Sequence, residues 1–167
     1  MKYMQTGGFE HHPLMRRTIL WVLVFLAGLW ATNLCMYFAR MGLNPSSVQA
    51  YYLGSEQDFR PPRSAASMLE VTHAHLPIMG LTMLLLTHLA IFAPYTDRAK
   101  KFLISGGFAT TLAQEASGWL VRFVHPGFAW LKVVSFLCFQ TVLLGLIASV
   151  AFFLLARPKH KRHSGAI

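Results

Sequence analysis

The chain has 167 residues, 54% of them hydrophobic, and a net charge of +9 with only six acidic side chains. This balance excludes an ordinary soluble domain and indicates a small integral membrane protein, because an apolar run of roughly 18 residues or more is enough to span a bilayer. The basic residues flank the apolar runs, as residues that set membrane orientation do, so we do not expect nucleic acid as a partner.

Four apolar runs predict four transmembrane helices in a single membrane domain that comprises residues 1–167. The first run is 18–38, and the loop over 41–66 that follows it holds Pro and Gly turn signals, with room for a short helical turn around 47–52. The other predicted spans are 68–93, 102–124 and 128–156. A basic tail covers 157–167, and we expect it to contact anionic lipid.

The second span carries both a start signal and a kink signal. Ser67 and Glu70 fit the capping-box pattern Ser-x-x-Glu, which predicts that the helix begins near Met68. Pro77 lies inside the span, where it removes a backbone hydrogen bond and frees the carbonyl of His73. We therefore expect a long, kinked helix.

Lys and Arg are distributed unevenly between the two sides of the membrane. They concentrate in the N-terminal segment, in the loop over 96–101 and in the tail. Because such residues favour the cytoplasmic side, we predict an all-α, antiparallel four-helix bundle with both termini in the cytoplasm. The loop over 41–66 and the turn at His125 then face the periplasm, if this multi-pass protein lies in a bacterial inner membrane.

Three histidines on the second span are the main functional signal, because an ionisable side chain inside a bilayer is costly and points to function. At 100° per residue, His73 and His88 are about 60° apart, and Gly80 lies within about 20° of His73. His75 and His88 are about 140° apart. The kink at Pro77 leaves open which of His73 and His75 shares the face of His88.

The third span is the least hydrophobic, and its small residues allow close helix packing, so we expect it inside the bundle. One face is a polar stripe, whose members lie within about 40° of the direction of His125. This stripe comprises Gly107, Thr111, Gln114, Gly118 and His125. Glu115 and Arg122 form an adjacent stripe.

Antiparallel packing predicts which residues of these two spans share a level. His125 should meet the outer histidines, His73 and His75. His88 should lie level with residues 110–114, about a turn from Glu115. The expected result is an outer histidine cluster and an inner histidine with polar neighbours.

Haem b is the first chemistry consistent with this arrangement, because it needs imidazole ligands on facing helices and small residues beside the macrocycle. Either His73 or His75 would pair with His125. Candidate residues for space and for the propionates are Gly80, Gly118, Arg122, Arg60 and Arg63.

The four-helix architecture and the histidine spacing resemble those of the small membrane b-type cytochromes that anchor respiratory dehydrogenases. The resemblance implies haem b, quinone and electron transfer. The chain departs from a two-haem member, which needs four ligands, because His88 has no transmembrane histidine partner. A second haem would need a ligand from a partner subunit.

Quinone and proton chemistry is the second possibility. His88 or an outer histidine would hydrogen-bond a quinone carbonyl, and Glu115 or Glu70 would accept the proton, since imidazole titrates near neutrality. A metal ion is the third. His73, His75 and His125 with Glu70 supply three nitrogens and one oxygen, a set that suits Zn, Cu or Fe.

Structural roles compete with these chemistries. His125 would serve as an interface anchor. Glu115 would pair with Arg122, or would hydrogen-bond across the bundle to Asn33 or Gln140.

We expect a membrane subunit of a respiratory or photosynthetic electron-transfer complex that binds haem b, quinone or both near the outer face. Its partners would be other membrane or periplasmic subunits. The alternatives are a non-redox accessory or assembly subunit, and a small proton or metal-ion transporter using His88 and Glu115. The sequence holds no phosphate-binding loop and no nucleophile elbow, so any enzymatic role would be that of an electron-transfer subunit.

Overall fold

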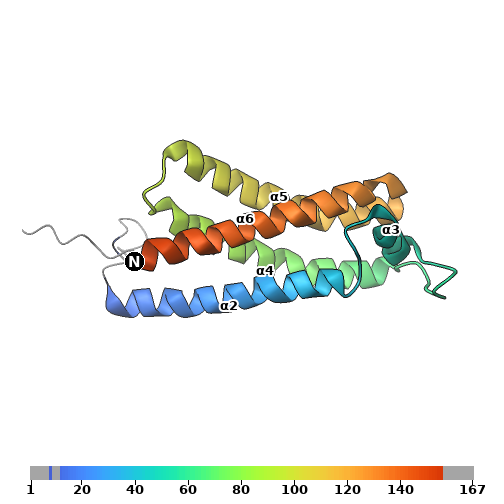
Figure 1. The fold of residues 1–167 in the computed structure, drawn as a ribbon, viewed down its shortest axis with the longest axis horizontal. Coiled ribbons are helices and arrows are strands. Elements are labelled where there is room, and N and C mark those ends of the chain that lie inside the picture. Colours follow the sequence, from blue (N-terminus) through green and yellow to red (C-terminus); the bar gives the residue numbers. More distant parts are fainter. Residues whose placement is uncertain (1–7, 9–11, 156–167) are drawn as a thin grey trace, which may run out of the picture.

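The computed structural model describes residues 8 and 12–155, and this part of the chain is all-helical, as predicted (Figure 1). The predicted lipid-binding tail over 157–167 lies outside the described residues. The elements are α2 (Pro13–Phe38), α3 (Pro45–Leu53), α4 (Ala65–Ile91), α5 (Asp97–Phe123), the 3-10 helix η2 (Pro126–Phe128) and α6 (Ala129–Leu155). Among these residues, strand-like pairing is confined to an isolated bridge between Ser55 and Arg60.

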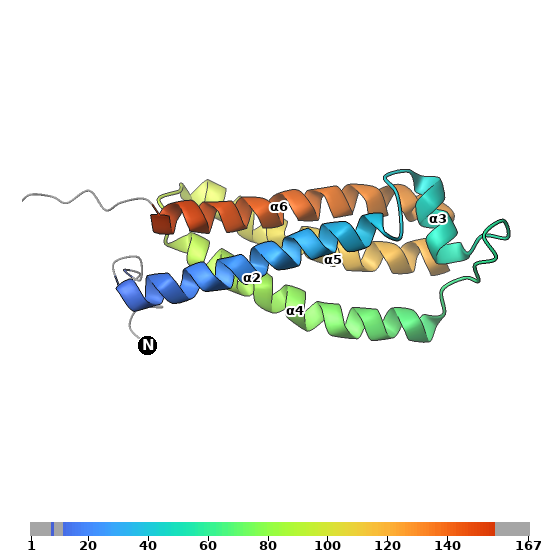
Figure 2. The same ribbon diagram turned by 60° about the horizontal axis from the view of Figure 1, so that its bottom comes forward.

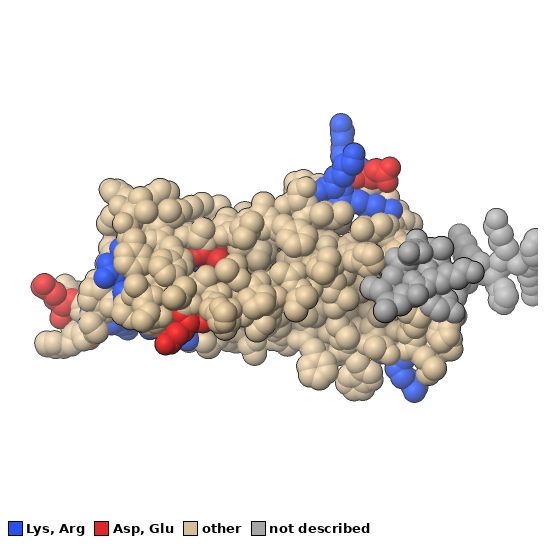
Figure 3. Space-filling view, turned by 180° about the vertical axis from the view of Figure 1, so that it is seen from behind, with Lys and Arg blue, Asp and Glu red and all other residues tan. Residues whose placement is uncertain are grey.

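Within the described part of the chain, three segments are long and apolar enough to cross a membrane: α2, α4 and Pro126–Leu155. α5 matches α4 in length but is more polar. On the face shown in Figure 3, the Lys and Arg side chains lie toward the two ends of the molecule. Apolar spans with basic ends are typical of a multi-pass membrane protein.

The second predicted span begins earlier than the capping box indicated. α4 starts at Ala65, and its cap is Ser64, whose hydroxyl oxygen accepts a hydrogen bond from the Ser67 backbone at 3.2 Å. Ser67 therefore sits inside the first turn and is not the cap. Ser64, three residues upstream, satisfies the free N–H of Ser67 instead, so the pattern Ser-x-x-Glu placed the helix start three residues too late.

The third helix also begins earlier, at Asp97 instead of 102. The Thr96 side chain accepts a hydrogen bond from the Ala99 backbone at 3.3 Å and caps α5. The basic residues that follow thus lie on the first turns of α5. The connection between α4 and α5 is reduced to residues 92–96, which fixes the antiparallel register of the two helices.

The short helical turn expected in the first loop is a complete helix, α3, which lies across one end of the bundle (Figure 2). Asn44 accepts a hydrogen bond from the Ser47 backbone at 2.7 Å, and Pro45 occupies the first helical turn. Both features favour a helix start, because the side chain satisfies a free N–H and proline needs none.

The four long helices run side by side (Figures 1 and 2). α5 and α6 form the most extensive pair, α4 packs on both, and α2 packs on α6. α2 and α4 do not pack closely against each other. In Figure 2 the N-terminal half of α4 stands apart from α6 toward the α3 end.

The core divides along the bundle into two clusters. The cluster remote from α3 is apolar and includes Met83, Leu86, Phe139, Leu143 and Leu146. The cluster at the α3 end is rich in aromatic residues and includes Tyr37, Tyr52, Met68, Val121 and Phe136. The predicted inward face of α5 is confirmed, since Gly107, Thr111, Gln114 and Gly118 are all buried.

Candidate functional site

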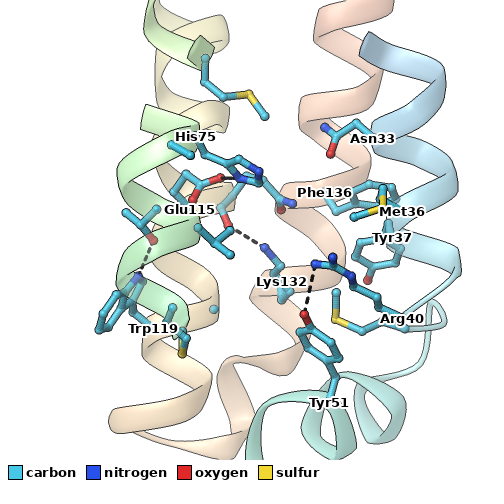
Figure 4. Close-up of a pocket in the computed structure, with 18 of the residues that line it drawn as sticks. Asn33, Met36, Tyr37, Arg40, Tyr51, His75, Glu115, Trp119, Lys132 and Phe136 are labelled. Atoms are coloured by element: carbon cyan, nitrogen blue, oxygen red, sulfur yellow. Dashed lines mark hydrogen bonds and ion pairs between the residues drawn. The ribbon is translucent and has the colours of Figure 1, made fainter. Parts of the chain in front are cut away.

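A cavity of about 730 Å³ lies in the half of the bundle that α3 covers. Its walls come from α2, α3, α4, α5 and α6 (Figure 4). Part of the lining is apolar: Leu29, Met36, Val71, Ile78 and Phe136. α2 packs on α6, and α4 packs on α5 and α6, which leaves this space between α2 and α4. The volume falls within the range of small-molecule sites in proteins, roughly 300–1,000 Å³.

One wall of the cavity carries a histidine–carboxylate pair. His75 from α4 and Glu115 from α5 approach to 3.1 Å between Nδ1 and Oε1. Glu115 is only 13% exposed, whereas His75 is 44% exposed. A proton lies between imidazole and carboxyl in this contact, and the free Nε2 of such a ring is available to a ligand. The pair is thus a place where a proton can be held and passed on beside an apolar chamber.

A buried lysine lies close to this pair. Lys132 on α6 is 6% exposed, and its Nζ donates a hydrogen bond to the backbone oxygen of Gln114 at 2.8 Å. The Glu115 carboxylate is near enough to interact with it electrostatically. Ser135 extends the network by donating to Gln114 Oε1 at 3.3 Å. A charged group held this deep is costly, so its position indicates a role in the cavity.

Arginine and tyrosine side chains line the end of the cavity next to α3. Tyr51 Oη accepts hydrogen bonds from Arg63 Nη2 at 2.8 Å and from Arg40 Nη1 at 3.3 Å. The Arg63 guanidinium also lies 4.4 Å from the centre of the Tyr51 ring. Two guanidinium groups therefore give this end of the cavity positive charge.

Tyr52 occupies the space in front of Gly118. A Cβ atom on Gly118 would lie 2.7 Å from Tyr52 Oη and 2.9 Å from its Cζ. Burial raises the pKa of the Tyr52 phenol above its usual 10, so the group stays neutral. We expected Gly118 to leave room for a macrocycle, but the structure fills that room with a tyrosine ring.

The outer histidine cluster does not assemble as predicted. His125 is exposed, and its Nδ1 accepts a hydrogen bond from the Gly127 backbone at 2.9 Å, which caps η2. His73 is exposed and does not line the cavity, so of the two outer histidines it is His75 that faces the site. Arg122 donates its Nε hydrogen to the Arg63 carbonyl at 2.8 Å and not to Glu115.

His88 and Glu115 lie at different levels, contrary to the predicted register. Glu115 meets His75, and Thr87 lies against Gly107. The short connection over 92–96 causes this shift, because it brings the level of His88 toward the start of α5. His88 Nε2 is buried without a hydrogen-bond partner among the described residues, and its ring packs edge-on against Phe92 at 5.6 Å.

The proposed ligand sets for haem and for a metal ion are not brought together. Of the histidines that the structure describes, His75 alone lines the cavity, and Gly80 has no heavy atom within 4 Å of the place where a Cβ would stand. Within residues 12–155 no group of three or more His, Cys, Asp or Glu is arranged to hold a metal ion. The donor set of this chain therefore does not fit a bis-histidine haem or the metal site of His73, His75, His125 and Glu70.

Sequence reasoning missed Lys132 and the Tyr51–Tyr52 pair. Because Lys132 lies at the start of the fourth span, it resembles the basic residues that set membrane orientation. The position of Lys132 nevertheless indicates a site residue. It is the fourth residue of an otherwise apolar helix, and helical-wheel projections place it opposite the polar stripe of α5. The tyrosines give no such signal, since their place depends on how α3 folds over the bundle end.

Comparisons with known proteins support the membrane assignment. No curated protein and no solved structure matches the chain significantly. Residues 42–161 match the family model Aq_1264_TM, which is described as a transmembrane helical domain. This match covers α3, α4, α5 and α6, so it includes most of the cavity lining. Because it extends over well more than half of the sequence, the chain belongs to the Aq_1264_TM family of transmembrane helical domains.

Proposed function

We propose that this protein is a quinone-binding membrane subunit of an electron-transfer complex. The observation that carries the proposal is the His75–Glu115 pair on the wall of a cavity of about 730 Å³ inside the bundle. A quinone site needs an apolar chamber for the ring, a polar group at the carbonyl and a proton source. The cavity has apolar walls, and the free nitrogen of His75 supplies the polar group.

In this proposal the protein residues bind the head group and handle protons. His75 donates a hydrogen bond to one quinone carbonyl, and Glu115 holds the imidazole in position and carries the exchangeable proton. Reduction of a quinone to a quinol takes two electrons and two protons, and the electrons come from a redox subunit of the same complex. Lys132, held by the Gln114 backbone oxygen at 2.8 Å, lies near the pair and favours negative charge as it develops.

The membrane arrangement belongs to the same proposal. α5 is the fourth span, because it lies alongside α4 and α6 and turns its polar face inward. The basic residues near the N-terminus and at the start of α5 put both termini in the cytoplasm. The host membrane is then the inner membrane of a bacterium, and the α3 end faces the periplasm.

Binding of a short-chain quinone to the purified full chain tests this proposal. Trp119 lines the cavity, and its Nε1 donates a hydrogen bond to Thr72 at 2.9 Å, so its fluorescence should fall as decylubiquinone binds. His75→Leu should weaken binding about tenfold or more, because it removes the hydrogen bond to the quinone carbonyl and leaves that oxygen without a partner. His73→Leu is the matched control, because His73 is exposed two residues away on the same helix.

Glu115→Gln separates positioning from proton transfer. The amide still bonds the imidazole but carries no acidic proton, so quinone binding should persist while proton transfer to the bound quinone during its reduction is slowed. Equal quinone affinity in His75→Leu, His73→Leu and wild type would contradict the proposal. Absence of quinone binding would favour the non-redox accessory role, and a Soret band would show that haem binds with a second ligand from a partner subunit.

A further inference from the structure

Two guanidinium groups meet at the α3 end of the cavity without a carboxylate between them. Arg40 follows the end of α2, and Arg63 precedes the start of α4. Both donate to the same oxygen, Tyr51 Oη, at 3.3 and 2.8 Å. Among the residues that the structure describes, the pair within ion-pair distance is His75–Glu115, and neither arginine is part of it.

This arrangement brings positive charges together at a cost. Arginine stays charged under all conditions in proteins, so the repulsion between the two groups is not relieved by loss of a proton. Tyr51 is neutral and acts only as an acceptor for both. Since the phenol oxygen uses its lone pairs for the arginines, its own hydrogen remains free to donate. Two guanidinium groups thus converge on one phenol oxygen, and each keeps further N–H donors besides the one that makes this bond.

The geometry points to an oxyanion as the missing partner. Guanidinium groups bind phosphate through paired N–H donors, and a tyrosine hydroxyl adds a further bond. We propose that Arg40, Arg63 and Tyr51 bind a phosphate group at the mouth of the cavity. These three residues lie at the α3 end of the cavity that also holds the His75–Glu115 pair, and the proposal does not depend on quinone binding.

The depth of the site favours a phospholipid as the source of the phosphate. Arg40 lies just beyond the last residue of the α2 span, which is the level of lipid head groups. The lining along α2 extends from Arg40 to Leu29, about 16 Å at 1.5 Å per residue, and Met36 and Leu29 supply apolar surface in it. An acyl chain fits beside such a wall, whereas a soluble phosphate would use only the mouth.

Native mass spectrometry of the full chain in detergent tests the proposal with three probes. They are phosphatidylglycerol, a diacylglycerol with the same acyl chains but no phosphate, and inorganic phosphate as a competitor. Wild-type protein should retain phosphatidylglycerol and not diacylglycerol. Competition by inorganic phosphate at matched concentration would assign the site to a soluble phosphate, and failure to compete would assign it to the lipid.

Variants link the binding to the two arginines. Arg40→Gln and Arg63→Gln should each weaken phosphate-dependent binding about tenfold or more, as loss of a charge-assisted hydrogen bond does. Arg98→Gln is the control, because Arg98 is exposed on the first turn of α5 and does not line the cavity. Tyr51→Phe should show a smaller loss, since the ring under Arg63 remains.

Arg40 is exposed, so Arg40→Gln is expected to fold even if Arg63→Gln does not. Arg63→Lys keeps the charge but loses the paired donors, and it should bind with intermediate affinity. The proposal is overturned if phosphatidylglycerol binds equally to wild type and Arg40→Gln. It is also overturned if neither phosphatidylglycerol nor inorganic phosphate binds to wild type.

Discussion

Replacement of Gly118 by alanine tests the packing that shapes the cavity. The new methyl group would lie 2.7 Å from Tyr52 Oη, 2.9 Å from Cζ and 3.1 Å from Cε1. These separations fall short of the optimum of about 3.5–4.0 Å between carbon atoms. The Tyr52 ring is buried and has the Tyr51 ring at 4.9 Å on its side, so it cannot swing away freely.

The expected cost follows from these contacts. Overpacking of a core typically costs about 1–3 kcal/mol. Alanine in place of glycine inside a helix gains about 1 kcal/mol, which offsets part of that loss. Gly106 on the same helix has no heavy atom within 4 Å of the place where its Cβ would stand, so Gly106→Ala should show the gain alone. Gly118→Ala should therefore be less stable than Gly106→Ala by about 1–3 kcal/mol.

Thermal unfolding in detergent, followed by far-UV circular dichroism, measures this difference. For a chain of this size about 2–4 °C corresponds to 1 kcal/mol, so the two variants should melt about 2–12 °C apart. Combining Gly118→Ala with Tyr52→Leu should remove the collision and show a coupling between the two sites. Equal melting temperatures for Gly118→Ala and Gly106→Ala would refute the reasoning that Tyr52 rests on Gly118.

Two further predictions concern polar groups around the cavity. Lys132→Met should leave the melting temperature unchanged or raise it, because the buried ammonium costs several kcal/mol to desolvate. The same variant should bind quinone more weakly. A drop in stability of more than about 1 kcal/mol would contradict the first expectation. Trp119→Phe loses the 2.9 Å bond to Thr72 and should lower stability by about 1 kcal/mol in the same unfolding assay. Thr72→Val should cost a similar amount, and the double variant should cost little more than either single one.

The helices α2, α4 and α6 were predictable because each is an apolar run with clear breakers, and such runs form helices independently of their neighbours. The inward face of α5 was predictable for a related reason. Its polar and small residues recur with the helical period, and only one face of a helix can turn to the bundle interior. Gln114 and Gly118 lie where that period put them.

The pairing of residues between helices was not predictable in the same way. Register depends on where each helix starts and on how tight the connections are. The cap at Thr96 lengthens α5 at its beginning, and this moves Glu115 to the level of His75 and away from His88. Likewise, the turn after α5 uses the His125 ring as its own cap, a local bond that competes with any contact to α4. Helical periodicity alone predicts neither the early start of α5 nor the cap formed by the His125 ring.

The two halves of the bundle differ in how they are packed, and this difference explains where Lys132 and Glu115 lie. Far from α3, side chains such as Met83, Phe139 and Leu143 close the interior completely. Packing in this half holds α4 and α6 together, so α4 can lie apart from α2 at the other end while the bundle stays assembled.

Polar groups such as Lys132 and Glu115 are costly in a membrane and tolerable only beside partners or water. The half that contains the cavity supplies both partners and access to water, since α3 covers its end and the cavity admits solvent or ligand. A ligand that binds there should therefore stabilise the α3 half selectively, and amide hydrogen exchange should slow in α3 and in the N-terminal half of α4 more than in the C-terminal half of α4.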